Sequence, residues 1–126
     1  YARIRPGSHF LPDSKIGNFV ETKNSKIKSK SKVNHLSYIG DTVVGENSNI
    51  GAGTITCNYD GIKKYKTKIK KNVFVGSNSS LVAPLVIEEN SVIGAGSVIT
   101  KSIKKNSLAL TRSPQITKKN YRRKKK

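Results

Sequence analysis

The stretch "IKKNVFVGSNSSLVAPLVIEENSVIGAGSVI" (residues 69–99) decides the fold of this chain. An aliphatic residue returns at every sixth position through it: Ile69, Val75, Leu81, Ile87, Ile93 and Ile99. A helix repeats about every 3.6 residues and a half-buried strand every two, so neither explains a period of six. A six-residue period is typical of a parallel β-helix, a coil of triangular cross-section in which each flat face holds about one hexad.

The same repeat extends toward the N-terminus. Earlier members are Ile16, Ile27, Val33, Ile39, Val44, Ile50 and Thr56, with one residue fewer between Ile39 and Val44. A glycine often follows the aliphatic residue, as in Ile50-Gly51 and Val75-Gly76. We expect three hexads to complete one turn, aliphatic side chains to stack as ladders inside the coil, and these glycines to supply the backbone freedom of the corners. The predicted class is all-β, a parallel β-helix of hexapeptide repeats.

Two interruptions of the repeat predict the domain organisation. Thirteen residues separate Thr56 from Ile69 where twelve would keep the phase, and "NYDG" (residues 58–61) has turn chemistry. We therefore predict a protruding loop near residues 57–68. The repeat fades after about residue 104, and Pro114 argues against a continuing strand. The prediction is a β-helix domain over residues 1–112 and an irregular basic tail over residues 113–126.

The formal charge of +18 on 126 residues fits either a polyanionic partner or a solvated lysine-rich surface. A basic nucleic-acid-binding module is therefore an alternative function, although few aromatic residues are available to stack on bases. Deleting residues 118–126 distinguishes a nucleic-acid-binding module from an enzyme, because the deletion should abolish salt-sensitive nucleic-acid binding and leave catalysis largely intact. No apolar window approaches the roughly 18 residues of a membrane span, and no secretory leader is recognised. The single cysteine, Cys57, fits a reducing cytoplasm.

His35, in "HLSYIGD" (residues 35–41), is the candidate general base. It lies inside a hexad, and a neutral imidazole accepts a proton near pH 7; the alternative is an ordinary surface histidine. His9 lies in the irregular opening segment and has no such setting. We interpret Cys57 as a small, partly buried side chain, and the Gly-x-Gly at residues 51–53 and 94–96 as corners of the coil. Two histidines and one cysteine predict no metal site.

Several stretches resemble one enzyme family: "RIRPG" (3–7), "GNFVE" (17–21), "HLSYIGD" (35–41), "NIGAGTITCNYDG" (49–61), "VFVGSNSSLVAP" (73–84) and "RSPQ" (112–115). They resemble the C-terminal domain of the bifunctional N-acetylglucosamine-1-phosphate uridyltransferase/glucosamine-1-phosphate N-acetyltransferase. The resemblance covers nearly the whole chain. It implies a left-handed β-helix and acetyl transfer from acetyl-CoA to the amine of glucosamine 1-phosphate. The product feeds UDP-N-acetylglucosamine synthesis, and so peptidoglycan and lipopolysaccharide.

The resemblance also implies roles for individual residues. It makes His35 the catalytic base. Arg5 and Lys23 are implied to hold the sugar phosphate, and Tyr38 and Asn49 to contact the sugar. Those implied for acetyl-CoA are Ala52, Asn58, Tyr59, Ser77, Ala95 and Arg112. Small side chains at Ala52 and Ala95 leave room for a pantetheine arm, and a guanidinium at Arg112 suits a phosphate of CoA.

Three expectations about partners follow from the same resemblance. We expect a homotrimer with active sites between subunits, a cytoplasmic location, and an N-terminal uridyltransferase domain in the full-length protein that is missing from this chain. No membrane or nucleic-acid partner is expected. A different hexapeptide acyltransferase, acting on another amino sugar or on serine, is a further alternative. The preference of the enzyme among glucosamine 1-phosphate, glucosamine 6-phosphate and the unphosphorylated sugar distinguishes this alternative from the first hypothesis.

Overall fold

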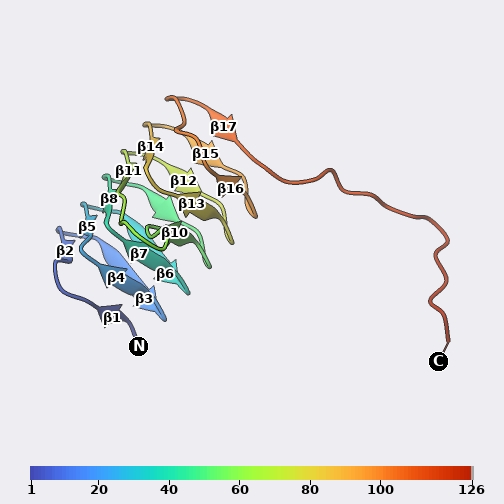
Figure 1. Ribbon diagram of the computed structural model, residues 1–126, viewed down its shortest axis with the longest axis horizontal. Coiled ribbons are helices and arrows are strands. Elements are labelled where there is room, and N and C mark those ends of the chain that lie inside the picture. Colours follow the sequence, from blue (N-terminus) through green and yellow to red (C-terminus); the bar gives the residue numbers. More distant parts are fainter. Residues whose placement is uncertain (126) are drawn as a thin grey trace.

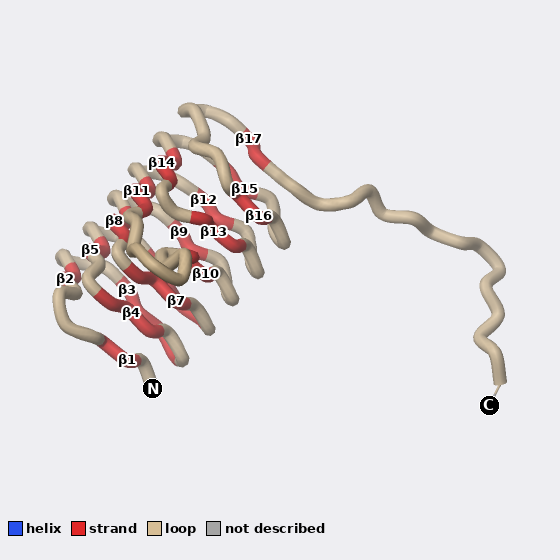
Figure 2. The backbone as a smooth tube through the Cα atoms, viewed as in Figure 1, coloured by secondary structure: helices blue, strands red, loops and turns tan. Residues whose placement is uncertain are grey.

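The computed structural model describes residues 1–125 as a coil of short parallel strands followed by an extended segment (Figure 1). Figure 2 shows strands and loops only, and residues 1–125 contain no helix. The strands form three parallel sheets, and successive turns of the coil stack strand upon strand in each of them. The six-residue spacing therefore predicted the architecture correctly.

Each sheet takes one strand from each turn. Sheet A contains β1 (Arg3–Ile4), β4 (Glu21–Lys23), β7 (Tyr38–Gly40), β10 (Ile55–Cys57), β13 (Ser80–Val82) and β16 (Val98–Ile99). Sheet B contains β2 (His9–Phe10), β5 (Lys26–Ile27), β8 (Thr42–Val44), β11 (Thr67–Ile69) and β14 (Leu85–Ile87). Sheet C contains β3 (Lys15–Asn18), β6 (Lys32–His35), β9 (Asn49–Ile50), β12 (Phe74–Val75), β15 (Val92–Ile93) and β17 (Leu108–Ala109).

The aliphatic hexad positions point into the coil and stack on one another. In sheet C, Ile50 pairs with Val75 and Val75 with Ile93, and each of the three is at most 2% exposed. Burying such a side chain fully contributes about 1.5–3 kcal/mol, so these ladders form a core without aromatic residues. The fully interior members of the predicted series are Ile27, Val33, Ile39, Val44, Ile50, Thr56, Ile69, Val75, Leu81, Ile87, Ile93 and Ile99. Ile16 is only partly buried because β3, in the first turn, pairs on one side only.

The glycines that follow the aliphatic positions do not have the predicted role. Gly51 and Gly76 are not among the residues with positive φ. A Cβ on Gly51 would instead lie 2.5 Å from the carbonyl oxygen of Val75 in the next turn, and a Cβ on Gly76 would meet the backbone of Ala95. The expectation of corner flexibility was therefore wrong at these positions. Glycine is required there because successive turns approach too closely for any side chain.

Asparagines supply most of the positive φ angles at the corner between sheets B and C. Asn47, Asn72 and Asn90 have φ of 53°, 54° and 58°, a region that asparagine tolerates better than most residues. Their side chains stack: Asn47 Nδ2 donates to Asn72 Oδ1 (2.8 Å), and Asn72 Nδ2 donates to Asn90 Oδ1 (3.2 Å). We call these three residues the asparagine ladder. Within it, the amide of Asn72 accepts from Asn47 and donates to Asn90.

Between β10 and β11 the chain leaves the coil as a loop. Within it, Asp60 Oδ1 accepts hydrogen bonds from the backbone N–H groups of Ile62 (2.8 Å) and Lys63 (2.7 Å). The carbonyl of Asn58 accepts from the N–H of Tyr65 (2.8 Å) and closes the base of the loop. The loop is thereby given a defined shape outside the coil.

At its C-terminal end the coil continues beyond the point where the repeat fades. Ile103 is 7% exposed, and β17 pairs in parallel with β15. The expectation of irregular structure after about residue 104 was therefore wrong as far as Ala109. The repeat is hard to see there because Ile103 follows Ile99 by four positions and not six. Residues 113–125 extend away from the coil (Figure 1), and Lys126 of the predicted tail lies outside the described residues.

Candidate active site

His35 ends β6 and lies on the outside of the coil, immediately before the corner between sheets C and A. Ala52, Ser77 and Ala95 occupy the same place on the next three turns. Successive turns are tied there by backbone hydrogen bonds, from Gly53 to His35 (3.4 Å), from Asn78 to Ala52 (2.8 Å) and from Gly96 to Ser77 (2.8 Å). We call His35, Ala52, Ser77 and Ala95 the His35 row.

The His35 row suits a long, thin ligand. It spans about 14 Å, because neighbouring strands lie about 4.8 Å apart. Beyond His35 its side chains are small, and those of Ser77 and Ala95 are exposed. At the far end, Arg112 Nη1 donates to the carbonyl oxygen of Ala95 (3.0 Å). The structure thus brings together five predicted site residues, with an imidazole at one end and a guanidinium at the other.

A second group, on sheet A, concentrates positive charge. Arg5 and Lys23 follow paired positions of β1 and β4, and Arg5 Nη1 forms an ion pair with Glu21 Oε2 (3.3 Å). Lys64 reaches this group from the loop. The nearby ammonium group of Lys23 lowers the pKa of Lys64, because two like charges lie close together there; burial and the charge of Arg5 add smaller contributions, and the charge of Asp41 opposes them. Three neighbouring cations of this kind suit a phosphate group. We call Arg5, Lys23 and Lys64 the cation cluster.

Sequence reasoning missed Lys64. The loop and the start of β11 carry lysines at 63, 64, 66 and 68, and nothing in their spacing distinguishes one from another. Only the folded loop brings Lys64 to Lys23, which is 41 positions away in the chain.

Tyr38 begins β7, two residues after the corner that follows His35. Its phenol lies across Gly40, since a Cβ on Gly40 would fall closest to the Tyr38 hydroxyl. Asn58 Nδ2 donates to the Tyr38 hydroxyl (3.3 Å) and to Asp41 Oδ2 (2.7 Å). Asn58 is 7% exposed, so its amide is held by these contacts.

Asp41 is the acidic residue of this group, and it is 8% exposed. Burial raises the pKa of Asp41, but the hydrogen bonds from Asn24 and Asn58 and the charges of Lys23 and Lys64 outweigh it. The pKa of Asp41 therefore lies below its ordinary value. The carboxylate is ionised at neutral pH and accepts hydrogen bonds only.

Three of the predicted residues lie apart from their expected partners. Asn58 packs with Tyr38 and Asp41 and is not part of the His35 row. Tyr59 is exposed on the loop, where its hydroxyl donates to the carbonyl of Gly61 (2.7 Å). Asn49 faces outward from sheet C, in register with Phe74, whereas Tyr38 lies on sheet A. A single chain does not bring Asn49 to Tyr38.

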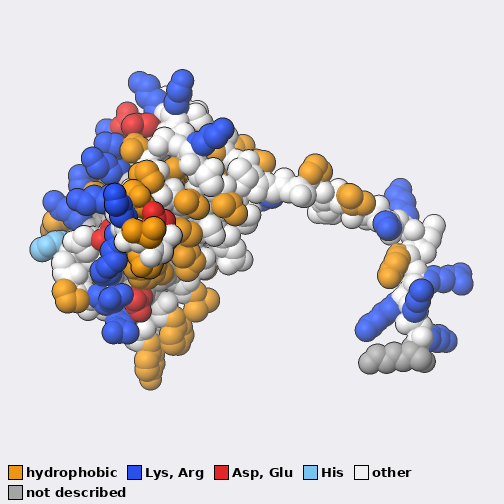
Figure 3. Space-filling model, in the orientation of Figure 1, with side chains coloured by type: hydrophobic (Ala, Val, Ile, Leu, Met, Phe, Trp, Pro, Cys, Tyr) orange, Lys and Arg blue, Asp and Glu red, His pale blue; other side chains and the backbone are white. Residues whose placement is uncertain are grey.

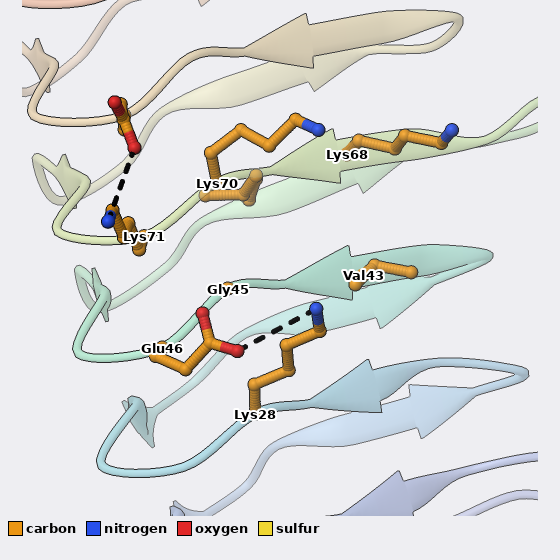
Figure 4. A pocket seen from close by; sticks show the side chains of 9 residues that line it. Lys28, Val43, Gly45, Glu46, Lys68, Lys70 and Lys71 are labelled. Carbon is orange, nitrogen blue, oxygen red and sulfur yellow. Dashed lines mark ion pairs between the residues drawn. The ribbon is translucent and has the colours of Figure 1, made fainter.

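A separate hollow on the outer face of sheet B is lined by lysines. In Figure 4, Lys28 lies on one turn and Lys68 and Lys70 lie two turns further on, with Val43 between them. Lys28 Nζ is 3.7 Å from Glu46 Oε1. Figure 3 shows Lys and Arg side chains along this edge of the body and again in the tail. No predicted site residue lines this hollow, so it is distinct from the candidate active site.

Residues 1–125 hold no group of three His, Cys, Asp or Glu side chains placed to bind a metal ion. No helix in this part of the chain is long and apolar enough to cross a membrane. Cys57 is half-buried, with its Sγ 4.0 Å from the carbonyl oxygen of Ile55.

Comparison with known proteins identifies the relatives of the chain. The family model for the bacterial transferase hexapeptide (six repeats) matches residues 66–101. The chain is 58% identical over 123 residues to the bifunctional protein GlmU of Acinetobacter baylyi, a match that covers 98% of the chain and 27% of the relative. This chain carries a hexapeptide repeat and matches the C-terminal part of GlmU. The GlmU of Alcanivorax borkumensis is 56% identical over 126 residues, covering all of the chain and 28% of the relative. The chain thus spans about a quarter of the length of these curated relatives.

Solved structures confirm the fold. A point mutant of AntD, an N-acyltransferase from Bacillus cereus, aligns with a TM-score of 0.79 at 19% identity, over 87% of this chain and 74% of that one. The acetyltransferase domain of PglB from Neisseria gonorrhoeae aligns with a TM-score of 0.76 at 17% identity, over 85% and 50% of the two chains. The all-β solenoid matches the left-handed β-helix that the resemblance implied.

Proposed function

We propose that this chain transfers the acetyl group of acetyl-CoA to the amine of glucosamine 1-phosphate. The observation that carries this proposal is the arrangement around the corner between sheets C and A. The His35 row lies on the sheet C side of this corner, and Tyr38 and the cation cluster lie on the sheet A side. The high identity to proteins named bifunctional GlmU supports the same reaction. Further support comes from a structural neighbour described as an N-acyltransferase in complex with coenzyme A.

On the sugar side, the cation cluster binds the phosphate through charge-assisted hydrogen bonds. Tyr38 contacts the sugar and directs its amine toward His35. The imidazole of His35 removes a proton from the ammonium group, because only the free amine carries the lone pair needed for attack. We add Lys64 to the phosphate-binding residues implied by the family resemblance, because it lies beside Lys23.

On the acyl side, the pantetheine arm of acetyl-CoA lies along the His35 row, with Arg112 near a phosphate of CoA. The amine nitrogen attacks the thioester carbonyl carbon, so an N–C bond forms and the C–S bond breaks. The second proton of the nitrogen passes to the departing thiolate. The products are N-acetylglucosamine 1-phosphate and free CoA.

A homotrimer is part of the proposal. Apolar side chains stand outward on neighbouring faces of the coil: Phe74 (51% exposed), Val92 (41%) and Leu108 (67%) on sheet C, and Ile55 (40%) and Val98 (49%) on sheet A. We call these five residues the apolar stripe. Phe74, Val92 and Leu108 follow one another in register on sheet C. Exposed apolar patches of this kind mark protein–protein contacts, and a second copy of the chain is the occupant that we propose. An N-terminal uridyltransferase partner domain and a cytoplasmic location stay predictions.

The test is release of free thiol from acetyl-CoA by the purified chain, measured in parallel with glucosamine 1-phosphate, glucosamine 6-phosphate and glucosamine. We expect thiol release with the first sugar at least tenfold faster than with the others. A folded protein that acts equally on all three would support another hexapeptide acyltransferase, and one that acts on none would contradict the proposal.

The cation cluster gives a second prediction. Replacing Lys64 by alanine should raise KM for glucosamine 1-phosphate about ten- to 150-fold, since one hydrogen bond to a charged group contributes about 1.5–3 kcal/mol. KM for acetyl-CoA should change little. Lys63→Ala is the matched control, because Lys63 is the adjacent loop lysine and its backbone is hydrogen-bonded to Asp60 within the loop. Equal effects of the two variants would show that Lys64 has no specific role.

A further inference from the structure

Asp41 occupies a corner of the coil where the fold does not require an acid. It has a φ of 49°, and Asn24, one turn earlier in the same corner, has a φ of 46°. Asparagine and aspartate tolerate this region about equally well. At the corner between sheets B and C, the asparagine ladder fills the same kind of position with amides alone. An asparagine at position 41 would therefore satisfy the backbone, and the carboxylate needs another explanation.

Aspartate and asparagine at position 41 differ in the hydrogen bonds that they can donate and accept. An ionised carboxylate only accepts, so both neighbouring amides must turn their NH₂ groups toward Asp41. Asn24 Nδ2 donates to Oδ1 (2.8 Å), and Asn58 Nδ2 donates to Oδ2 (2.7 Å). An asparagine at position 41 would have an NH₂ group of its own. It could then accept from one neighbouring amide and donate to the other, as Asn72 does in the asparagine ladder. Donation to Asn58 would require the amide of Asn58 to present Oδ1 in place of its NH₂ group.

The orientation of Asn58 determines what the site offers to a ligand. Its NH₂ group has two hydrogens, and they are directed to Asp41 and to the Tyr38 hydroxyl oxygen. Within residues 1–125, Asn58 Oδ1 accepts no hydrogen bond and the Tyr38 hydroxyl donates none. The site thus presents one free acceptor beside one free donor. A sugar hydroxyl, which both donates and accepts, matches this pair.

We propose that Asp41 is a positioning residue that holds Asn58 with Oδ1, and Tyr38 with its hydroxyl hydrogen, available to a hydroxyl group of the amino-sugar phosphate. This inference rests on the proposed function for its substrate. It assigns to Asp41 an effect transmitted through Asn58 and no contact with the reacting atoms.

Two possible roles of Asp41, orienting Asn58 and contributing negative charge, predict opposite effects of Asp41→Asn on sugar binding. Asp41 lies close enough to Lys23 and Lys64 for their charges to act on it. Removing its negative charge would therefore strengthen phosphate binding if charge were its main contribution. If Asp41 acts by orienting Asn58, Asp41→Asn should weaken binding of the sugar instead.

The test is a double-mutant cycle of Asp41→Asn and Asn58→Ala, read as kcat/KM for glucosamine 1-phosphate. We expect Asp41→Asn alone to lower kcat/KM about tenfold, the cost of one mismatched hydrogen bond, with KM for acetyl-CoA changed less than about twofold. In the Asn58→Ala background the same change should cost less than about twofold. Additive losses, or a fall in KM for the sugar, would overturn the proposal.

Asn72→Asp is the matched control, because it makes the reverse exchange inside the asparagine ladder, away from the site. We expect it to leave kcat/KM unchanged. A second readout does not need the reaction: hydrogen exchange of the Asn58 side-chain NH₂, identified by its loss in Asn58→Ala. Exchange should be at least tenfold slower in the wild type than in Asp41→Asn, and equal rates would contradict the orienting role. If the wild type acetylates nothing, the proposed function fails while this measurement still tests the contact.

Discussion

Replacing His35 by alanine should lower kcat for acetylation of glucosamine 1-phosphate by about 10²–10⁴-fold, the usual contribution of a general base. The variant should fold, because His35 is exposed at the end of β6 and its side chain makes no contact that the coil requires. KM for both substrates should change little, since the imidazole acts on the proton and does not hold the phosphate or CoA. Thiol release under saturating substrates measures the effect.

His9→Ala is the matched control for this prediction. His9 is the other histidine of the chain and lies on β2, in sheet B, away from the His35 row. Its replacement should leave kcat unchanged. If His35→Ala keeps more than about a tenth of the wild-type kcat while its oligomeric state is unaltered, His35 is not the base.

Introducing glutamate at both Phe74 and Val92 should convert a trimer into monomers and lower the activity at least about 100-fold. The two residues pair in β12 and β15 at the centre of the apolar stripe. Burying two carboxylates without partners costs several kcal/mol each, more than a contact between subunits can tolerate. A coil of this kind buries its core within each chain, so the monomer should stay folded. Light scattering and circular dichroism follow the two effects separately.

Val43→Glu is the control for the stripe. Val43 stands outward on β8 in sheet B, where an added carboxylate has lysines nearby. It should leave both the oligomer and the activity unchanged. A monomeric wild-type chain that is fully active would contradict the role given to the trimer. It would also contradict the idea that Asn49 and Tyr38, which lie on different sheets of one chain, meet at an active site between subunits.

The periodicity of the chain was sufficient to predict the core. Every hexad position from Ile27 to Ile99 in the predicted series is buried, because a residue that returns to the same place on each turn has the same environment on each turn. The role of the glycines was not predictable in this way. Whether Gly51 needs a positive φ or a close neighbour depends on how near Val75 comes, and that is a property of the stacked turns.

Some of the candidate site residues could likewise be assigned from the sequence, whereas others could not. His35, Ala52, Ser77 and Ala95 were predictable from motifs and from the resemblance to one family, and the coil explains why they align: each stands just before the same corner. The loop residues were harder to assign. Lys64 and Asn58 reach Lys23 and Asp41 only because residues 58–66 fold back over sheet A.

By itself the sequence determined the class of fold, the interior residues, the family and the candidate base, because each of these is written in local spacing or in short motifs. Only the tertiary structure decided which lysine joins the cation cluster, which way the amide of Asn58 points, and that Asn49 and Tyr38 occupy different faces. The physical reason is that these features depend on contacts between residues far apart in the chain. Their distances and hydrogen-bond directions exist only once the turns are stacked and the loop is closed.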